Sequence, residues 1–466
     1  MSGVLADRYA SQEMRDIWSQ ENKIILEREL WIAILKTQKN LGLQVSDKVI
    51  SAYEEVKSKV NLTSINSREK VIKHDVKARI DEFNLLAGHE SIHIGLTSRD
   101  VTENVELLQI KSSLDLIDFK SLAFLHKLGE SIESFISIPI VARTHNVPAQ
   151  VTTLGKRFAT WAEELIFAIQ HLQQLRNRLA LRGIKGAVGT QQDAMDVIGV
   201  NITSLDREIA QLLNFNSVSE AVSQIYPRSF DYEVLTSLIQ ISAAPTNMAT
   251  NIRLMSGQGL VSESFKEEQV GSSAMPHKVN ARSSERVNGL GVILKGYAAM
   301  ITQISGNQWN EGDVSCSVVR RVALPDSFYA LDAILDTSIN ILSNLEISQE
   351  AIKSELNETL PFVLSSKILM KAVEQGMGRE VAHEAIKAHA RNAFAHYKET
   401  RVNNFFELVS NDKSLGVSKE FLVDLLINPL QHSGRAQEQC TDIVNRVNSL
   451  CLGRNDVSTY LPQEPI

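Results

Sequence analysis

Proline is missing from two long stretches of this 466-residue chain, residues 1–138 and 149–226. Because proline lacks a backbone N–H and breaks or kinks a helix, both stretches leave room for long helices. Between residues 151 and 181, apolar side chains recur at spacings of three and four: Phe158, Trp161, Leu165, Ala168, Leu172, Leu175 and Leu179. This is the period of one helix face, so we interpret these side chains as core packing.

The same period marks three further segments: 105–128, 234–254 and a run from Ser283 past Ile301. We expect Pro245 to kink the second of these. The alternation of apolar and polar residues that marks strands is scarce. The sequence therefore predicts an all-α protein built on a central bundle of long helices.

Turn-type residues at 98–100 and at Leu360–Pro361 suggest where this bundle begins and ends. We expect an N-terminal helical domain at 1–100, a central bundle domain at 101–355 and a C-terminal helical domain at 356–466. Several bundle helices are apolar around most of their circumference, which favours burial on most sides. A symmetric homo-oligomer would provide that burial.

Composition excludes several classes of protein. The net charge of -7 and the pI near 5.9 give no global basic field for nucleic acid. Cys316, Cys440 and Cys451 form no Cys-x-x-Cys motif, so neither a disulfide framework nor a cysteine zinc site is indicated. We expect no signal peptide and no membrane span, since neither a basic leader before an apolar stretch nor a run of about 20 apolar residues is present. These features favour the cytoplasm.

The segment Gly271–Asn280, Gly-Ser-Ser-Ala-Met-Pro-His-Lys-Val-Asn, gathers two hydroxyls, a lysine and an amide around one proline. Pro276 rules out a regular helix through its centre, which leaves a polar loop. Removing a proton next to a carboxylate needs such groups, because a serine can accept the proton while a cation and an amide hold the negative charge. An ordinary surface loop is the alternative.

Other polar segments have both structural and functional interpretations. Thr97 and Ser98 follow a glycine and can bind an anion or cap the next helix, and spacing favours the cap. His145 lies between Pro139 and Pro148, where a turn histidine is usually structural but is also suited to proton transfer. His74 and Asp75 lie in a charged helical setting where a solvated face is the ordinary interpretation.

Ser317 and Arg321 are four residues apart and would share one face if that segment is helical. Together with Arg320 they offer a hydroxyl and guanidinium groups, which suit a phosphate or a carboxylate.

The loop Gly271–Asn280 resembles the signature of the fumarase/aspartase superfamily, Gly-Ser-Ser-x-Met-Pro-x-Lys-x-Asn, at every fixed position. Nearly the whole chain is similar to the adenylosuccinate lyase family. The segments that carry this resemblance are Arg8-Tyr9, Lys-His-Asp-Val at 73–76, His-Ile-Gly-Leu-Thr-Ser at 93–98, Arg-Thr-His-Asn-Val-Pro-Ala-Gln at 143–150, Arg-Gly-Ile-Lys-Gly-Ala at 182–187, Gln-Ile-Tyr-Pro-Arg at 224–228 and Ser-Glu-Arg at 284–286.

The resemblance implies a three-domain, mostly α-helical homotetramer around a 20-helix core, with active sites shared between subunits. It implies a nucleotide substrate and β-elimination of fumarate, without a metal or an organic cofactor. The implied catalytic residues are Ser272 as the base (Ser273 is the second choice), Lys278 and Asn280 for the carbanion, His145 as the general acid, Glu285 to orient it, and His74 on the nucleotide side. The implied substrate-binding residues are Arg8, Tyr9, Asp75, Thr97, Ser98, Gln224, Arg286, Ser317 and Arg321.

Three positions depart from the family pattern. Gly312 stands where the family has the arginine of Trp-x-Glu-Arg-Asp, Ala281 replaces a proline, and Val147 replaces a glutamine. The loss of a cation at position 312 keeps two alternatives open. One is a paralogous lyase that releases fumarate from another N-succinyl compound, and the other is a helical scaffold without catalysis.

Overall fold

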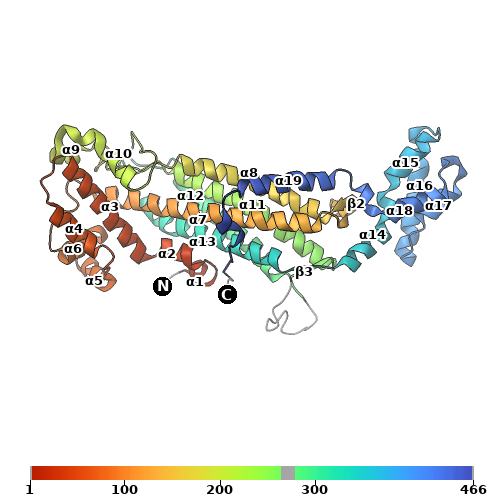
Figure 1. Cartoon of the computed structure of the whole chain (residues 1–466), viewed down its shortest axis with the longest axis horizontal. Coiled ribbons are helices and arrows are strands. Elements are labelled where there is room, and N and C mark those ends of the chain that lie inside the picture. Colours follow the sequence, from red (N-terminus) through yellow and green to blue (C-terminus); the bar gives the residue numbers. More distant parts are fainter. Residues whose placement is uncertain (1–2, 264–278, 464–466) are drawn as a thin grey trace.

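Long helices run side by side through the middle of the molecule in the computed structural model, which describes residues 3–263 and 279–463 (Figure 1). These central helices are α7 (Ser98–Phe135), α8 (Leu154–Asn177), α11 (Ser229–Gly257), α12 (Arg282–Ile304) and α13 (Ser315–Ser343). Each of the four segments with a helical apolar period is a helix, so the predicted all-α bundle is confirmed.

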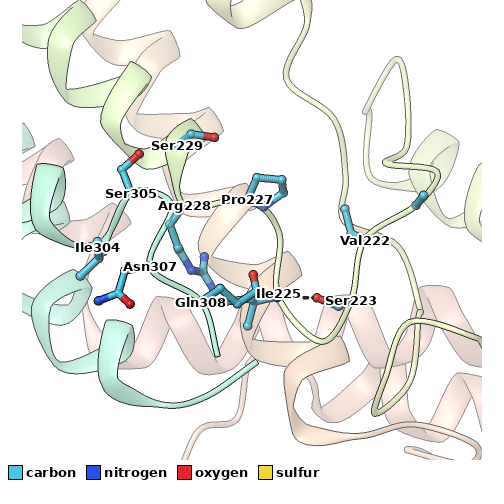
Figure 2. A pocket seen from close by; sticks show the side chains of 12 residues that line it. Val222, Ser223, Ile225, Pro227, Arg228, Ser229, Ile304, Ser305, Asn307 and Gln308 are labelled. Carbon is cyan, nitrogen blue, oxygen red and sulfur yellow. Dashed lines mark hydrogen bonds between the residues drawn. The ribbon is translucent and has the colours of Figure 1, made fainter. Parts of the chain in front are cut away.

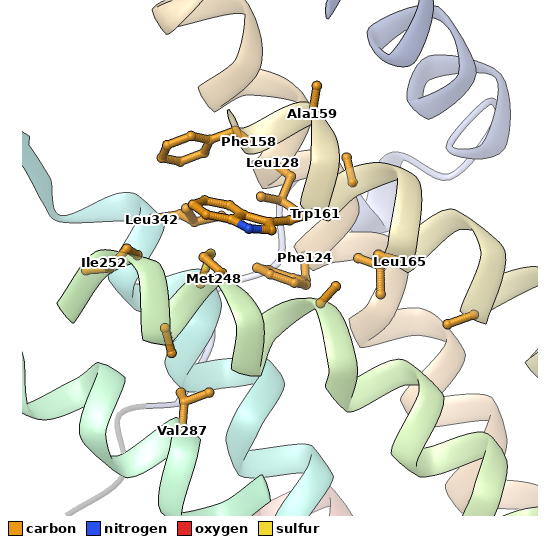
Figure 3. Close-up of a cluster of buried hydrophobic side chains, with 14 of the residues drawn as sticks. Phe124, Leu128, Phe158, Ala159, Trp161, Leu165, Met248, Ile252, Val287 and Leu342 are labelled. Atoms are coloured by element: carbon orange, nitrogen blue, oxygen red, sulfur yellow. The ribbon is translucent and has the colours of Figure 1, made fainter. Parts of the chain in front are cut away.

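Large apolar side chains fill the centre of this bundle. Phe124 and Leu128 of α7 meet Phe158 and Trp161 of α8, with Met248 of α11 beside them (Figure 3). All are at most 2% exposed. Burying such a side chain contributes about 1.5–3 kcal/mol relative to leaving it in water, so the predicted core stripe of α8 holds the bundle together.

Smaller elements cover the two ends of the bundle. One end carries α3 (Gln20–Asn40), α4 (Asp47–Val56), α5 (Leu62–Ile72) and α6 (Asp75–Ala87), together with α9 (Gln192–Ile198), η1 (Gly199–Asn201) and α10 (Ile202–Leu212), which follow α8. The short helices α1 (Val4–Arg8) and α2 (Gln12–Ile17) lie along the bundle itself, where α1 contacts α13 and α2 contacts α7 and α13.

The other end carries most of the C-terminal helices: α14 (Gln349–Val363), α15 (Ser365–Glu374), α16 (Arg379–Thr400), α17 (Phe405–Asn411), η2 (Lys413–Leu415), α18 (Lys419–Ile427) and η3 (Pro429–His432). The chain then returns to pack along α7 and α8 through α19 (Ala436–Leu450) and α20 (Asn455–Ser458).

Strands among the described residues form two short antiparallel pairs. These are β1 (Pro139–Thr144) with β2 (Val147–Thr153), and β3 (Val261–Glu263) with β4 (Leu345–Ile347). The first pair is a hairpin that connects the end of α7 to the start of α8.

Two local expectations are wrong. Residues 98–100 are the first turn of α7 rather than a loop, and Leu360–Pro361 lies inside α14. α11 also runs through Pro245 without a break, and the expected kink there stays a prediction. Leu360, Pro361 and Pro245 are buried, so packing outweighs the local preference of proline. The division into three domains stays a prediction, and α14 crosses residue 355 without a break.

A buried ion cluster ties both chain ends to the bundle. Lys120 of α7 donates to Asp332 at 2.6 Å and to Asp336 at 2.8 Å, both on α13. The backbone N–H of Ser11 donates to Asp332 at 2.6 Å, and the Tyr460 hydroxyl donates to Asp336 at 2.8 Å. The N-terminal and C-terminal segments therefore meet at the middle of the bundle (Figure 1).

None of the described helices is both long and apolar enough to cross a membrane. The cysteines Cys316, Cys440 and Cys451 are all free thiols.

Candidate functional site

The start of α7 is fixed by a carboxylate that caps it. The backbone N–H and the hydroxyl of Thr97 donate to one oxygen of Asp100 at 2.8 and 3.2 Å. The other Asp100 oxygen accepts from Arg182 at 2.7 Å and from the backbone N–H groups of Lys185 and Gly186 at 2.8 and 2.9 Å. Thr97 thus has the cap position that its spacing predicted, and residues 182–186 wrap around this helix end.

Beside this cap lies a second buried network that joins α7, α11 and α13. Arg228 donates to both oxygens of Glu103 at 2.7 and 2.6 Å, and Arg320 donates to Asp231 at 2.7 Å and to Glu106. Burial by itself raises the pKa of Glu106, but Arg320 and other nearby cations outweigh it and hold that pKa below its usual value. The partners of Arg320 therefore give it a structural role.

Ser317 and Arg321 lie one turn apart near the start of α13, which confirms the helical spacing. The Ser317 hydroxyl accepts from Arg99 at 2.9 Å, and Arg99 also donates to the Asp313 carbonyl at 3.3 Å. Sequence reasoning missed Arg99, because only the structure places the first turn of α7 against α13.

Asp75, at the first position of α6, belongs to the same region. Burial raises the pKa of its carboxyl, but Arg79, a backbone N–H, Lys23 and Arg321 together hold that pKa below the usual value. His74 caps α6, and its Nδ1 accepts from the Lys77 N–H at 3.2 Å. Arg321 of α13 thus lies close enough to Asp75 of α6 for its charge to lower the pKa of that carboxyl.

Gln224 completes this region, because its backbone N–H donates to the Glu311 carbonyl at 3.0 Å. A cavity of about 340 Å³ adjoins the Gln224 loop and is bordered by Ser223, whose hydroxyl accepts from Gln308 at 2.8 Å (Figure 2). We name the gathered residues the α7 N-terminal cluster: His74, Asp75, Thr97, Ser98, Gln224, Ser317 and Arg321.

Gly312 has a structural reason to be glycine. Its φ is +153°, and a Cβ at this position would lie 3.1 Å from Cβ of Gln224 and 3.2 Å from Oε1 of Gln224. A side chain here would press on a predicted substrate-binding residue in a backbone conformation that favours glycine. The departure from the family pattern therefore involves the backbone as well as the missing charge.

A partly buried histidine that sequence reasoning did not single out, His93, lies near Asp100 and His74. The indole N–H of Trp31 donates to Nδ1 of His93 at 3.1 Å. Since indole is only a donor, that ring nitrogen is unprotonated. Burial is the main cause that lowers the pKa of His93 to about 4.

A second group of predicted residues lies around the N-terminal segment. The Arg286 guanidinium lies over the Tyr9 ring with its carbon 5.9 Å from the ring centroid. Burial is the first cause that lowers the pKa of Arg286, and Arg8 is among the nearby cations that lower it further. Arg8, Tyr9 and Arg286 thus lie close together, and we name them the Arg286 cluster.

The start of α12 follows the signature loop. The Asn280 carbonyl accepts from the Arg282 N–H at 2.8 Å, and the exposed Glu285 is in the first turn of α12. Glu263 supports this turn by accepting from the N–H groups of Ser283 and Ser284 at 3.0 and 2.9 Å. Ser272, Ser273 and Lys278 lie outside the described residues.

His145 lies at the tip of the β1–β2 hairpin. His145 and Asn146 form a two-residue turn with φ of +51° and +62°, and both side chains are exposed. Positive φ at both positions is typical of the tight hairpin turn. The predicted turn is therefore confirmed, and we name residues Thr144–Val147 the hairpin tip.

One chain does not bring these groups together. The α7 N-terminal cluster lies at the start of α7 and the hairpin follows its end, with a helix of 38 residues between them. At 1.5 Å per residue this separation is about 57 Å. Figure 1 shows β2 at the end of the bundle opposite α3 and α6. Among the described residues, no three His, Cys, Asp or Glu side chains gather as metal ligands.

Comparisons with known proteins identify the family of this chain. A "Lyase" family model matches residues 6–296, and an "Adenylosuccinate lyase C-terminus" model matches residues 361–443. Adenylosuccinate lyase of Saccharomyces cerevisiae is 34% identical over 454 residues, covering 95% of this chain and 93% of that protein. Adenylosuccinate lyase of Pyrococcus abyssi is 32% identical over 453 residues, covering 95% and 97%.

Solved structures share the fold at lower identity. A fumarate lyase from Mesorhizobium sp. BNC1 superposes with a TM-score of 0.82 at 19% identity, covering 96% of this chain and 99% of that one. The 3-carboxy-cis,cis-muconate lactonizing enzyme from Pseudomonas putida gives a TM-score of 0.83 at 19% identity, with the same coverage. With full-length relatives above 30% identity and both family models matched, this chain belongs to the adenylosuccinate lyase family of carbon–nitrogen lyases.

Proposed function

We propose that this protein eliminates fumarate from adenylosuccinate to give AMP, and from succinylaminoimidazole carboxamide ribotide to give AICAR, in purine biosynthesis. The observation that carries this proposal is the α7 N-terminal cluster. It gathers hydroxyls, an amide and the Arg321 guanidinium, which suit a phosphorylated dicarboxylate substrate. Relatives named adenylosuccinate lyase match along the full length of the chain.

In the proposed reaction, Ser272 removes the proton from the carbon next to the carboxylate. Lys278 and Asn280 hold the carbanion charge on that carboxylate. The C–N bond then breaks as the C=C bond of fumarate forms, and His145 protonates the departing nitrogen. Glu285 orients His145. In this scheme these side chains carry every proton that moves.

We propose that the sites are shared between the subunits of a homotetramer. A separation of about 57 Å within one chain leaves His145 and the α7 N-terminal cluster in different sites unless another chain supplies one of them. Exposed apolar side chains on the central helices, such as Phe167 of α8 and Val292 and Met300 of α12, supply a surface for such packing. Free cysteines suit a reducing compartment, and we propose the cytoplasm.

Mixing two inactive variants tests the sharing. His145→Ala and Ser272→Ala proteins, after subunit exchange, should regain part of the activity because some sites then draw both intact residues from different chains. Exchange proven by mass spectrometry without recovered activity contradicts shared sites. A monomer by light scattering contradicts the assembly itself.

The second candidate is a paralogous lyase acting on another N-succinyl compound, and Gly312 is the observation that favours it. Incubating the wild-type protein with adenylosuccinate and then with other N-succinyl amines, while measuring fumarate, separates the two. Efficient release from adenylosuccinate supports the first proposal. Release only from another compound supports the second, and no release from any supports a scaffold without catalysis.

A further inference from the structure

An ion pair between Arg143 and Glu355 supports the hairpin tip. Arg143 of β1 donates from Nη1 to the Asn146 carbonyl at 3.3 Å and from Nη2 to the carboxylate of Glu355 on α14. The two side chains are only 23% and 14% exposed. One guanidinium therefore links the turn that carries His145 to the first C-terminal helix.

The same carboxylate faces a second arginine. Arg157 of α8 donates to the Val141 carbonyl of β1 at 3.3 Å. Burial lowers the pKa of Arg157, and the positive charge of Arg143 lowers it further. The negative charge of Glu355 acts in the opposite direction. Arg143, Arg157 and Glu355 therefore interact electrostatically with one another. Glu355 thus lies between two arginines, each of which holds a backbone carbonyl of the hairpin.

The hairpin depends on this support because its ladder is weak near the tip. The pairing register shifts between Ala142 and Arg143, and Arg143 then pairs with Pro148, which has no N–H to donate. Neither His145 nor Asn146 is glycine, although both have positive φ. Such conformations cost on the order of 1 kcal/mol each and persist only when the surroundings fix them.

We infer that Arg143 and Glu355 are positioning residues for His145, which hold its imidazole where the leaving nitrogen receives a proton. This inference rests on the proposed function of His145. It also makes α14 part of the catalytic geometry, although no predicted site residue lies on it. A displacement of about 1 Å at a reacting group can lower the rate by about 10²-fold, so a small shift of the tip is sufficient.

Four variants test the pair: Arg143→Ala, Arg143→Lys, Glu355→Ala and Glu355→Gln. The alanine variants should lower kcat by about 10–100-fold and change KM for adenylosuccinate by less than about 3-fold, since the substrate-binding groups are untouched. Arg143→Lys and Glu355→Gln should lower kcat by less than the alanine variants do. Arg446→Ala breaks a more exposed ion pair, between Arg446 of α19 and Glu163 of α8, and should leave kcat unchanged.

Repeating the Glu355 substitution in a protein that lacks His145 distinguishes a positioning role of Glu355 from a general structural role. In a His145→Ala protein, adding Glu355→Ala should lower the residual kcat by less than about 2-fold, because the acid it positions is already absent. An equal loss in both backgrounds would overturn the inference.

Amide hydrogen exchange provides a readout independent of turnover. Arg143→Ala should speed exchange in residues 139–153 while leaving α8 protected, and unchanged exchange there would also overturn the inference. If wild type releases no fumarate from adenylosuccinate, the proposed function fails, and the exchange experiment still decides whether the pair holds the tip.

Discussion

The two ends of the central bundle differ in how their candidate functional residues are supported. At the α7 N-terminal cluster, the binding side chains rest on Asp100, Glu103, Arg182, Arg228 and Arg320, which are all at most 3% exposed and share several partners each. At the hairpin tip, an exposed histidine rests on a short ladder and one ion pair. Under the proposed function, the difference teaches that substrate binding is secured by the buried networks of the fold, whereas proton transfer depends on an exposed hairpin tip with few supporting contacts.

The sharpest test of the hairpin end is His145→Ala. Loss of a general acid should lower kcat by about 10²–10⁴-fold, with a change in unfolding free energy below about 0.5 kcal/mol, because the side chain is exposed. Steady-state kinetics and urea unfolding measure both quantities. Near-normal kcat would remove His145 from the mechanism.

At the α7 N-terminal cluster, Arg182→Ala should chiefly lower the free energy of unfolding. It leaves the buried Asp100 carboxylate without its ion-pair partner, and breaking one side of such a pair costs about 3–5 kcal/mol. Urea unfolding or the thermal midpoint would show this. A variant as stable as wild type would contradict the claim that the buried network secures this end.

Arg321→Ala tests binding without disturbing that network. Losing a charge-assisted contact worth about 1.5–3 kcal/mol should raise KM for adenylosuccinate by about 10–100-fold with little change in kcat. The neighbouring buried Arg320→Met should instead lower stability, which makes the pair a matched comparison. An unchanged KM in Arg321→Ala places the phosphate site elsewhere.

Acidification should affect the binding end through His93. Its pKa is about 4 in the folded protein and about 6.5 unfolded, so between these values the unfolded chain binds more protons and stability falls as pH falls. From pH 7 to 5 the loss should be about 2 kcal/mol. His93→Gln should remove this part of the pH dependence in urea unfolding, and an unchanged pH dependence in that variant would contradict the assignment.

Much of this fold could be predicted because its signals are local. The apolar period of 151–181 predicts α8, and the cap at Thr97 and the turn at His145 depend on a few neighbouring residues. The buried ion pairs could not be predicted. Arg182 pairs with Asp100, which is 82 residues away in the sequence, and Arg320 pairs with Asp231, which is 89 residues away. No rule of residue spacing predicts pairs so far apart.

The sequence predicted which residues belong to the candidate site, but not how those residues are arranged in space. Gly312 shows why, since the sequence reveals a missing cation while only the structure reveals its φ of +153° and that a Cβ there would press on Gln224. The separation of His145 from the α7 N-terminal cluster also depends on a helix length that the apolar pattern between 105 and 128 understated.

The buried Lys120 has a consequence for how the chain is made. Its carboxylate partners, Asp332 and Asp336, are synthesised 212 and 216 residues later, and the Tyr460 hydroxyl comes from near the end of the chain. Burying the ammonium before then would cost several kcal/mol. On the ribosome, the middle of the bundle therefore gains its full stability only after most of the chain has emerged, and until then α7 lacks its contacts with α13.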